Sequence, residues 1–421
     1  MESDLIKQLL LDQKETFNRK KSLIERDLDL TPFLKTRQVV VITGVRRCGK
    51  SVLLFLIKQK LELTEEHYCY VNFDDERLIP ETAILEQIYL AHIELYKIEP
   101  VFFFDEIQNV PNWEKFVNRV HEKGLKVYVT GSNANLLSSE IATSLTGRNK
   151  TITLFPFSFT EYMRFKEKSS DFSRMTSTQI SLIQSEFQEY MKLGGFPLVV
   201  EENDLELVNH YFQDILYRDI IARYRISQVN ELKHIAIYLA SNTGKLFSFS
   251  TLQAVSGVKS TNSVKSYLDY LEQSYLFFYL KKFDYSLKKQ ILNSRKVYVI
   301  DPAFCNRLGF HFSENKGRIL ETIIFLQLLR LKQEAFYYSG KKECDFIVQK
   351  GLNVTQAIQV VYELNDINVR REVEGLMEAL TTYGLEKGVL ITADNQLKSG
   401  VIPDQIEVIL AWKWLIINSF S

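Results

Sequence analysis

One stretch of sequence decides the fold, and it reads Val39-Val40-Val41-Ile42-Thr43-Gly44-Val45-Arg46-Arg47-Cys48-Gly49-Lys50-Ser51-Val52. Its first part is β-branched and apolar, which is typical of a strand buried on both faces. Its second part fits the pattern G-x-x-x-x-G-K-[ST] without a gap, and a helical stretch follows over residues 51–61. A strand, a glycine-rich turn and a helix in this order predict a parallel α/β sheet with a ligand at its carboxyl edge.

The glycine-rich turn predicts a phosphate site. Two glycines allow the backbone to curl so that successive N–H groups face the phosphates, and the following helix directs its positive end to the same point. Lys50 is expected to neutralise the β- and γ-phosphates of ATP, and the Ser51 hydroxyl to coordinate Mg²⁺. We therefore assign nucleotide binding to Gly44, Val45, Arg46, Arg47, Cys48, Gly49, Lys50, Ser51 and Val52.

Two carboxylates follow a second apolar strand, Val101-Phe102-Phe103-Phe104-Asp105-Glu106. Asp105 is expected to hold Mg²⁺ through water, and Glu106 to orient or deprotonate the attacking water. The next strand, residues 127–130, runs into Gly-Ser-Asn133, whose amide can hydrogen-bond the water or the γ-phosphate. These residues predict ATP hydrolysis, with Glu106 and Asn133 as catalytic residues and Ser51 and Asp105 at the metal.

Composition bounds the remaining possibilities. The 421 residues are 46% hydrophobic and 25% charged, which indicates a globular chain of about two to four domains. The formal net charge is zero, so contact with nucleic acid requires a local basic patch. Apolar runs are too short to cross a bilayer, no secretory signal opens the chain, and the four cysteines lack metal-ligand spacing. A reduced, cytoplasmic protein without a membrane partner is expected.

Changes in pattern along the chain predict five parts. They are an N-terminal helix (1–35, with its helical pattern over 3–29), a P-loop ATPase core (36–165), a helical region (166–243), a middle segment (244–300) and a C-terminal α/β unit (301–421). The C-terminal unit is expected to hold five strands, near Phe336 and over residues 344–349, 356–362, 388–392 and 406–411.

Further motifs in the chain resemble those of a known protein family. They are Tyr70-Val71-Asn72-Phe73-Asp74-Asp75-Glu76, Asp105-Glu106-Ile107-Gln108, Thr130-Gly131-Ser132-Asn133, and Leu145-Thr146-Gly147-Arg148 followed by Phe155-Pro156-Phe157-Ser158. With the phosphate loop, they resemble prokaryotic AAA+-type ATP-binding proteins whose C-terminal domain of unknown function is related to restriction endonucleases. The resemblance implies ATP hydrolysis and an α/β fold with a P-loop sheet, a helical region and a nuclease-like tail.

AAA+-like enzymes often complete their site with an arginine from the same or a neighbouring subunit. This makes Arg148, in the loop before the last core strand, the first candidate for a catalytic arginine. Arg218 and Arg223 are the alternatives. A homo-oligomer is one possible partner arrangement.

The middle segment predicts a winged helix-turn-helix. A short helix (249–256), a turn at Gly257, a second helix (259–274) and two strands (275–280 and 296–300) follow in that order. Residues 281–296 include six basic residues, Lys281, Lys282, Lys288, Lys289, Arg295 and Lys296. DNA contact through residues 259–296 is the first interpretation, and a protein partner is the alternative.

The C-terminal unit resembles the restriction-endonuclease-like fold in its order of helix, strand and strand. Glu321 and Asp345 match two acids that hold a divalent metal there. However, the Glu-x-Lys positions carry Gln359 and Val361. Glutamine still offers an oxygen to Mg²⁺, but valine cannot replace a lysine. A degenerate, non-cleaving domain is expected; an ATP-gated nuclease would need a lysine from elsewhere, such as Lys341, Lys342 or Lys350.

Overall fold

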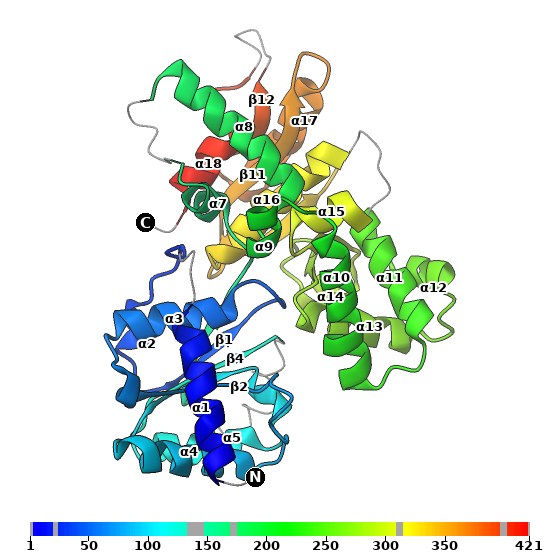
Figure 1. Cartoon of the computed structure of the whole chain (residues 1–421). Coiled ribbons are helices and arrows are strands. Elements are labelled where there is room, and N and C mark those ends of the chain that lie inside the picture. Colours follow the sequence, from blue (N-terminus) through cyan, green and yellow to red (C-terminus); the bar gives the residue numbers. More distant parts are fainter. Residues whose placement is uncertain are drawn as a thin grey trace. The chain divides into compact units, whose positions relative to one another are not determined.

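The computed structural model describes residues 3–19, 24–132, 147–168, 175–308, 315–395 and 402–419. The chain divides into two compact units, Met1–Phe155 (unit 1) and Pro156–Ser421 (unit 2). Each unit has its own sheet and helices (Figure 1). The finer division into five parts stays a prediction.

Unit 1 is built on a five-stranded sheet in the order β2-β3-β4-β1-β5, and all of its pairings are parallel. This confirms the predicted α/β sheet. Strand β4 lies between β1, which leads into the glycine-rich loop, and β3, which ends in Asp105. The strands are β1 (Val39–Thr43), β2 (Tyr68–Asn72), β3 (Val101–Asp105), β4 (Val127–Gly131) and β5 (Asn149–Thr153).

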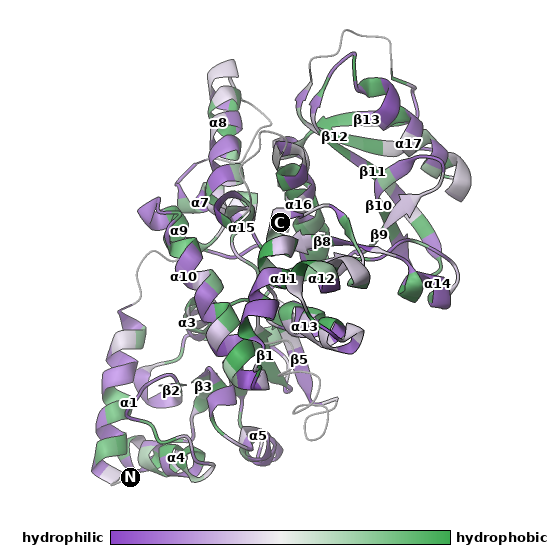
Figure 2. Cartoon of the chain, turned by 90° about the vertical axis from the view of Figure 1, so that its right-hand side faces the viewer, coloured by the Kyte–Doolittle hydropathy of each residue, from purple (hydrophilic) through white to green (hydrophobic). Residues whose placement is uncertain are grey.

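Helices cover this sheet because its central strands are apolar on both faces. Val39, Val40, Val41 and Ile42 are all fully buried, and each such side chain contributes about 1.5–3 kcal/mol when it leaves water. In Figure 2 the helices α1 and α5 carry purple, hydrophilic residues beside green ones, as expected of helices with one covered face. The helices are α1 (Ser3–Asn18), α2 (Thr31–Leu34), α3 (Lys50–Lys60), α4 (Ala83–Tyr96), α5 (Trp113–Glu122) and the short η1 (Glu65–His67) and η2 (Ile107–Asn109).

The N-terminal helix α1 packs against β2 and α4. It ends at Asn18, so the helix predicted over residues 3–29 is shorter than expected. Gln13 pairs with the edge strand: its amide nitrogen donates to the Asn72 carbonyl and its oxygen accepts from the Asn72 N–H. Phe17 stacks on Tyr70, with ring centroids 3.8 Å apart. The helix thus satisfies part of the β2 edge, which would otherwise be free to pair with another chain.

Unit 2 contains a second five-stranded sheet in the order β13-β12-β11-β10-β9. Strands β9, β10 and β11 pair antiparallel, and β11, β12 and β13 pair parallel. All five predicted strands of the C-terminal unit are present. They are β9 (Glu334–Ser339), β10 (Glu343–Lys350), β11 (Asn353–Leu364), β12 (Gly388–Asn395) and β13 (Ile406–Leu410), packed with α16 (Asn315–Arg330), α17 (Val369–Tyr383) and α18 (Ala411–Ile417).

A three-stranded antiparallel sheet in the order β6-β8-β7 forms the middle of unit 2. The predicted helix, glycine turn, helix and pair of strands are all found, and β7 pairs antiparallel with β8, with helix α14 in the connection between them. The winged-helix assignment stays a prediction. The elements are α11 (Val229–Ser241), β6 (Leu246–Phe247), α12 (Phe249–Ser256), α13 (Thr261–Gln273), β7 (Phe277–Leu280), α14 (Leu287–Leu292) and β8 (Arg295–Val299).

The remaining elements of unit 2 are helical, as predicted for the region after the core. They are α7 (Phe159–Phe165), α8 (Ser177–Leu193), α9 (Pro197–Glu202), α10 (Leu207–Asp214), the π-helical η4 (Ile215–Ala222) and α15 (Pro302–Leu308). None of the helices in the described part of the chain combines the length and apolar character needed to cross a bilayer.

Candidate nucleotide site

The glycine-rich loop adopts a backbone that only glycine accepts at two positions. Gly44 has φ 147°, and a Cβ atom there would lie 2.1 Å from the Leu154 carbonyl oxygen. Gly49 has φ 100° and precedes the first turn of α3, which begins at Lys50. The first N–H groups of α3 are therefore presented at the loop, which is the arrangement that binds phosphate.

Lys50 is buried and folds back over the loop. Its Nζ donates to the carbonyl oxygens of Gly44 and Val45, each at 3.2 Å. The same atom lies 3.6 Å from Glu106 Oε1. The structure thus brings the lysine of the loop and the carboxylate that directly follows β3 together, although strand β4 lies between β1 and β3.

Asp105 is held from both sides. The Thr130 hydroxyl donates to its Oδ1 at 2.5 Å, and the Tyr70 hydroxyl donates to its Oδ2 at 3.1 Å. Burial, followed by the nearby Asp105 charge, raises the pKa of Tyr70, so this phenol stays protonated and remains a donor. Both carboxylate oxygens therefore have fixed directions before any ion binds, which favours a single coordination geometry.

Glu106 follows directly and is oriented by its own partners. Its backbone N–H donates to the Thr130 hydroxyl at 2.9 Å, so one threonine positions both acids. Gln108 donates to Glu106 Oε2, which leaves Oε1 facing Lys50. The residue has φ 54°, a left-handed conformation that costs a non-glycine residue energy and that clusters at functional sites.

The other residues assigned to the loop divide between core and surface. Val45 and Cys48 are buried, and burial raises the pKa of the Cys48 thiol. Arg46 lies with Nη1 3.8 Å from Asp74 Oδ2, while Arg47 is exposed. Ser51 and Val52 occupy the first turn of α3.

Arg26 is a residue of this site that the motifs did not identify. Its guanidinium donates to the Cys48 carbonyl at 3.2 Å and to the Phe155 carbonyl at 2.6 Å. It thereby ties the phosphate loop to the segment after β5. The sequence showed only a basic residue between the N-terminal helix and the core, and nothing in its spacing indicated this contact.

The predicted catalytic residues after β4 are not all placed at the loop. Asn133 lies outside the described residues. Arg148 precedes β5, and its carbonyl accepts from the Val39 N–H, at the opposite edge of the sheet from the loop. Its guanidinium contacts Asn118 and Glu122, each at 2.7 Å. The structure therefore does not bring Arg148 to the loop of its own chain, and a role toward a neighbouring copy stays a prediction.

The two alternative arginines belong to unit 2. Arg218 is exposed, with Nε 3.5 Å from Asp214 Oδ1 one helical turn away, and Arg223 is also exposed. Surface pairs of this kind contribute little to stability. Their candidacy as catalytic arginines stays a prediction.

The basic segment of unit 2 differs from expectation at one residue. Lys288 and Lys289 of α14 and Lys259 and Lys265 near α13 are exposed, while Lys281, Lys282 and Arg295 are half-buried. Lys296, however, is buried, and its ammonium contacts carboxylates within unit 2. Its inclusion in a DNA-contacting surface was therefore wrong, because a buried and paired ammonium cannot reach a phosphate backbone.

Comparison with known proteins agrees with the phosphate-loop geometry. Residues 36–163 match the family model of an AAA domain, and residues 184–315 match a domain of unknown function (DUF8612). Unit 1 is thus a P-loop core of the AAA type.

Two full-length relatives define the family more closely. The chain is 35% identical to an uncharacterized protein of Methanocaldococcus jannaschii over 430 residues, covering 97% of this chain and 95% of that one. It is 32% identical to an uncharacterized protein of Haemophilus influenzae over 419 residues, covering 94% of this chain and 99% of that one. The chain belongs to the family of AAA-domain proteins that these two represent.

Solved structures give weaker likenesses. The RuvB Holliday junction branch migration motor of Thermotoga maritima is 13% identical, with a TM-score of 0.29 over 65% of this chain and 87% of that one. The ORC2 protein of Aeropyrum pernix is 14% identical, with a TM-score of 0.31 over 64% and 86%. Both scores lie far below 0.5, so we base neither fold nor function on them.

Proposed function

We propose that the chain binds Mg²⁺-ATP at the loop of residues 44–52 and hydrolyses it. The observation that carries this proposal is the 3.6 Å approach of Lys50 Nζ to Glu106 Oε1 beside the doubly held Asp105. A cation for the phosphates, an acid for the metal and an acid for the water occupy one edge of one sheet. The AAA-domain match over residues 36–163 supports the same class of reaction.

Each side chain has a definite task in this reaction. When ATP binds, Lys50 gives up its hydrogen bonds to the loop carbonyls and pairs with β- and γ-phosphate oxygens. The negative charges of these oxygens compensate the energetic cost of burying the ammonium. Ser51 and Asp105 are the residues that would hold Mg²⁺, and the metal would neutralise charge on the phosphates. Glu106 takes the proton of the attacking water once Lys50 has turned to the nucleotide.

The test combines three single variants. Lys50→Ala is expected to lose ATP binding, because it removes the charge that neutralises the phosphates. Glu106→Gln is expected to keep binding while lowering turnover at least about 100-fold, since a general base contributes roughly that much. Lys60→Ala is the matched control, because Lys60 lies on the same helix with an exposed side chain paired to Glu25.

Fluorescent-nucleotide titration and phosphate release measure the two steps separately. If Glu106→Gln hydrolyses ATP as fast as the wild type, Glu106 is not the general base. If Lys50→Ala binds nucleotide as tightly as the wild type, the loop of residues 44–52 is not the nucleotide site. Both variants should keep the circular dichroism spectrum of the wild type.

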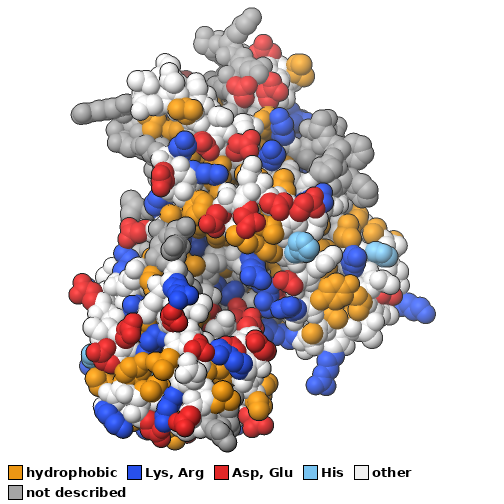
Figure 3. Space-filling view, in the orientation of Figure 1, with side chains coloured by type: hydrophobic (Ala, Val, Ile, Leu, Met, Phe, Trp, Pro, Cys, Tyr) orange, Lys and Arg blue, Asp and Glu red, His pale blue; other side chains and the backbone are white. Residues whose placement is uncertain are grey.

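We further propose that hydrolysis is coupled to DNA contact through residues 259–296, without Lys296. The exposed Lys259, Lys265, Lys288 and Lys289 supply phosphate contacts in a chain of zero net charge. On the face shown in Figure 3, acidic and basic side chains intermix over unit 1, so a field of one sign is not a general property of the surface.

Salt dependence tests this coupling. The double variant Lys288→Glu/Lys289→Glu should weaken DNA binding and reduce the slope of affinity against salt concentration by about two ion equivalents. The matched control Lys350→Glu/Lys387→Glu makes the same charge change at exposed lysines of the C-terminal sheet region. An equal loss of DNA affinity in both double variants would show that only the net charge of the chain determines DNA binding.

A protein partner is the second candidate, and one observation favours it. The segment around α14 exposes four large apolar side chains, Tyr285, Leu287, Ile291 and Leu292. Contiguous exposed apolar groups commonly mark interaction sites. If DNA leaves the ATPase rate unchanged, Leu287→Ser/Leu292→Ser should abolish stimulation by a purified partner while leaving basal turnover intact.

A further inference from the structure

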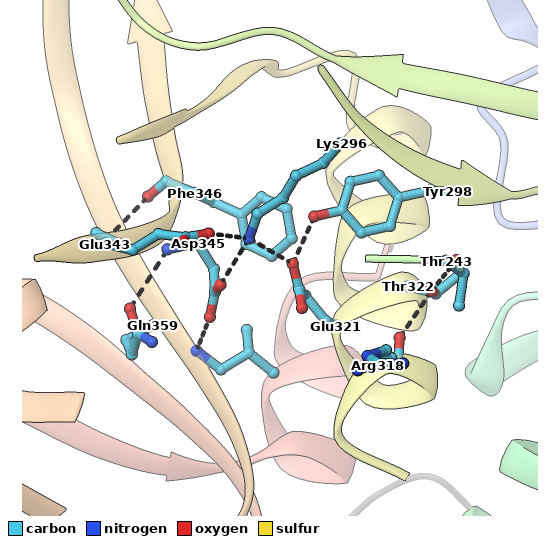
Figure 4. A network of polar contacts seen from close by, with 12 residues as sticks. Thr243, Lys296, Tyr298, Arg318, Glu321, Thr322, Glu343, Asp345, Phe346 and Gln359 are labelled. Carbon is cyan, nitrogen blue, oxygen red and sulfur yellow. Dashed lines mark hydrogen bonds and ion pairs between the residues drawn. The ribbon is translucent and has the colours of Figure 1, made fainter. Parts of the chain in front are cut away.

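The C-terminal sheet region contains a buried cluster of charges that the nucleotide site does not use. Lys296 of β8 contacts three carboxylates through its Nζ: Glu343 at 2.7 Å, and Glu321 and Asp345 at 3.0 Å each. Figure 4 shows the ammonium at the centre of these contacts. The four residues come from the three-stranded sheet, from α16 and from β10, so one side chain connects three elements.

Lys296 places an ammonium beside Glu321 and Asp345, where Val361 offers none. The candidates named from sequence, Lys341, Lys342 and Lys350, lie at exposed positions around the β10 strand, and Lys342 pairs with Glu374. Lys296 lies 49 residues before Asp345 in sequence. No motif spacing connects the two, and only the pairing of β8 within unit 2 brings the ammonium to the acids.

The cluster is closed to solvent on most sides. The side chain of Lys296 is 4% exposed, those of Glu321 and Asp345 are 12% and 11% exposed, and only Glu343 is half-exposed at 47%. A Cβ atom on Gly244 would lie 3.2 Å from Glu321 Oε2, so backbone approaches this carboxylate closely.

Two of these carboxylates have further partners. Asp345 Oδ2 accepts from the Val360 N–H at 3.0 Å, and the Tyr298 hydroxyl donates to Glu321 Oε1 at 2.5 Å. The Gln359 oxygen, which could serve as a metal ligand, accepts from the Asp345 N–H at 3.3 Å, while the amide nitrogen donates to Glu372.

The charge state agrees with the geometry. Burial by itself lowers the pKa of Lys296, but Glu321, Tyr298, Asp345 and Glu343 outweigh it and raise that pKa well above its ordinary value. The lysine is therefore an ammonium at neutral pH. Burial also raises the pKa of Glu321, against the opposing effect of Lys296.

We propose that the Lys296 ammonium takes the cation position of the Glu321–Glu343–Asp345 cluster and excludes a divalent metal ion from it. The ammonium donates to Glu321 and Asp345 and forms an ion pair with Glu343. A divalent ion needs oxygen ligands at about 2.0–2.6 Å, so it cannot share this position with Nζ. Displacing the lysine would leave a buried charge without a partner, which costs several kcal/mol in general. Among the described residues, no group of three or more His, Cys, Asp and Glu side chains is arranged to hold a metal ion.

As a consequence, unit 2 uses these acids to hold its two sheets together. The contacts of the Lys296 ammonium, and not those of a metal ion, connect β8, α16 and β10. This inference is independent of the proposed ATPase reaction, because no residue of the cluster belongs to unit 1.

Manganese titration of the full chain, followed by electron paramagnetic resonance in the absence of nucleotide, tests the proposal. Wild type and Asp345→Asn should bind the same amount of Mn²⁺, because the cluster contributes no site. Lys296→Met preserves the length of the side chain but removes its charge. The variant should gain a Mn²⁺ site at the cluster, so that its apparent affinity for Mn²⁺ rises roughly tenfold or more above that of the wild type. The gain should vanish in Lys296→Met/Asp345→Asn.

Two results would overturn the proposal. The first is Mn²⁺ binding by wild type that Asp345→Asn removes, since the metal would then displace the ammonium. The second is a folded Lys296→Met that gains no site. If Lys296→Met does not fold, Lys296→Met/Glu321→Gln serves as host, because it removes one positive and one negative charge together. That double variant should gain Mn²⁺ binding and a Mn²⁺-dependent rise in Tm, and the absence of both would contradict the assignment.

Discussion

The hydroxyl of Tyr70 donates a 3.1 Å hydrogen bond to Asp105 Oδ2, and this contact joins the N-terminal helix to the candidate magnesium site. The same ring stacks on Phe17 of α1 at 3.8 Å between centroids. The helix therefore supports the ring, and the ring orients the acid. Neither aromatic residue belongs to a nucleotide-binding motif, yet both determine where the carboxylate of β3 points.

Tyr70→Phe tests this relationship. The variant keeps the stack on Phe17 but removes the donor to Asp105, so one carboxylate oxygen loses its fixed direction. We expect about a 10-fold loss of turnover and a higher Mg²⁺ requirement, with nearly unchanged thermal stability. Phosphate release measured against Mg²⁺ concentration checks this.

Tyr68→Phe is the control for that variant. Tyr68 lies on the same strand, but its hydroxyl donates to Asn18 and does not reach Asp105. An equal loss of turnover in both variants would show that the phenol acts only through packing.

Thr130 joins the two acids of β3, and its replacement separates a chemical from a steric role. Thr130→Val keeps the shape but removes the bonds to Asp105 and the Glu106 N–H, so turnover should fall about 10- to 100-fold. Thr130→Ser restores the hydroxyl and should recover most of the activity. A serine variant as slow as the valine variant would contradict the hydrogen-bonding role.

Replacing Arg26 is predicted to lower the affinity for nucleotide without lowering the rate of hydrolysis at saturating ATP. Arg26→Ala removes two hydrogen bonds to loop carbonyls at Cys48 and Phe155, so the phosphate loop samples more conformations. We expect ATP to bind about 5- to 30-fold more weakly, which corresponds to about 1–2 kcal/mol. Turnover at saturating ATP should change little. Arg19→Ala, at an exposed residue paired with Glu15, serves as control in the same titration.

Because of the buried His92, we expect unit 1 to lose stability in mild acid. Burial, followed by the nearby Lys14, lowers the pKa of His92 from 6.5 to about 4. A base with a lowered pKa in the folded state contributes stability above pH 6.5, and this contribution is lost as the pH falls toward 4. The loss should be on the order of 3 kcal/mol.

Hydrogen exchange of unit 1 peptides between pH 7 and pH 4 measures this effect. His92→Gln keeps a donor for the Glu66 carbonyl but cannot take up a proton, so its stability should fall less steeply with acid. His67→Gln changes an exposed histidine nearby and should follow the wild type. Parallel curves for His92→Gln and wild type would contradict the prediction.

The contiguous features of this protein could be predicted from its sequence. The phosphate loop is one uninterrupted run from Gly44 to Ser51, and the acids directly follow the apolar strand that ends at Asp105. Such signals are local, because the strand before a turn and the helix after it depend on neighbouring residues. The parallel sheet of unit 1 and the five strands of the C-terminal sheet were predicted for the same reason.

The tertiary structure decided which distant side chains complete each site. Arg26 reaches Cys48 and Phe155, Tyr70 reaches Asp105, and Lys296 reaches Asp345, all across strands or segments far apart in the chain. No period or spacing encodes these contacts, since they depend on strand order and on how helices cover the sheets. The sequence by itself thus determined the nucleotide motif and the acids, while only folding determined that a lysine of β8 would meet the acids of the C-terminal sheet.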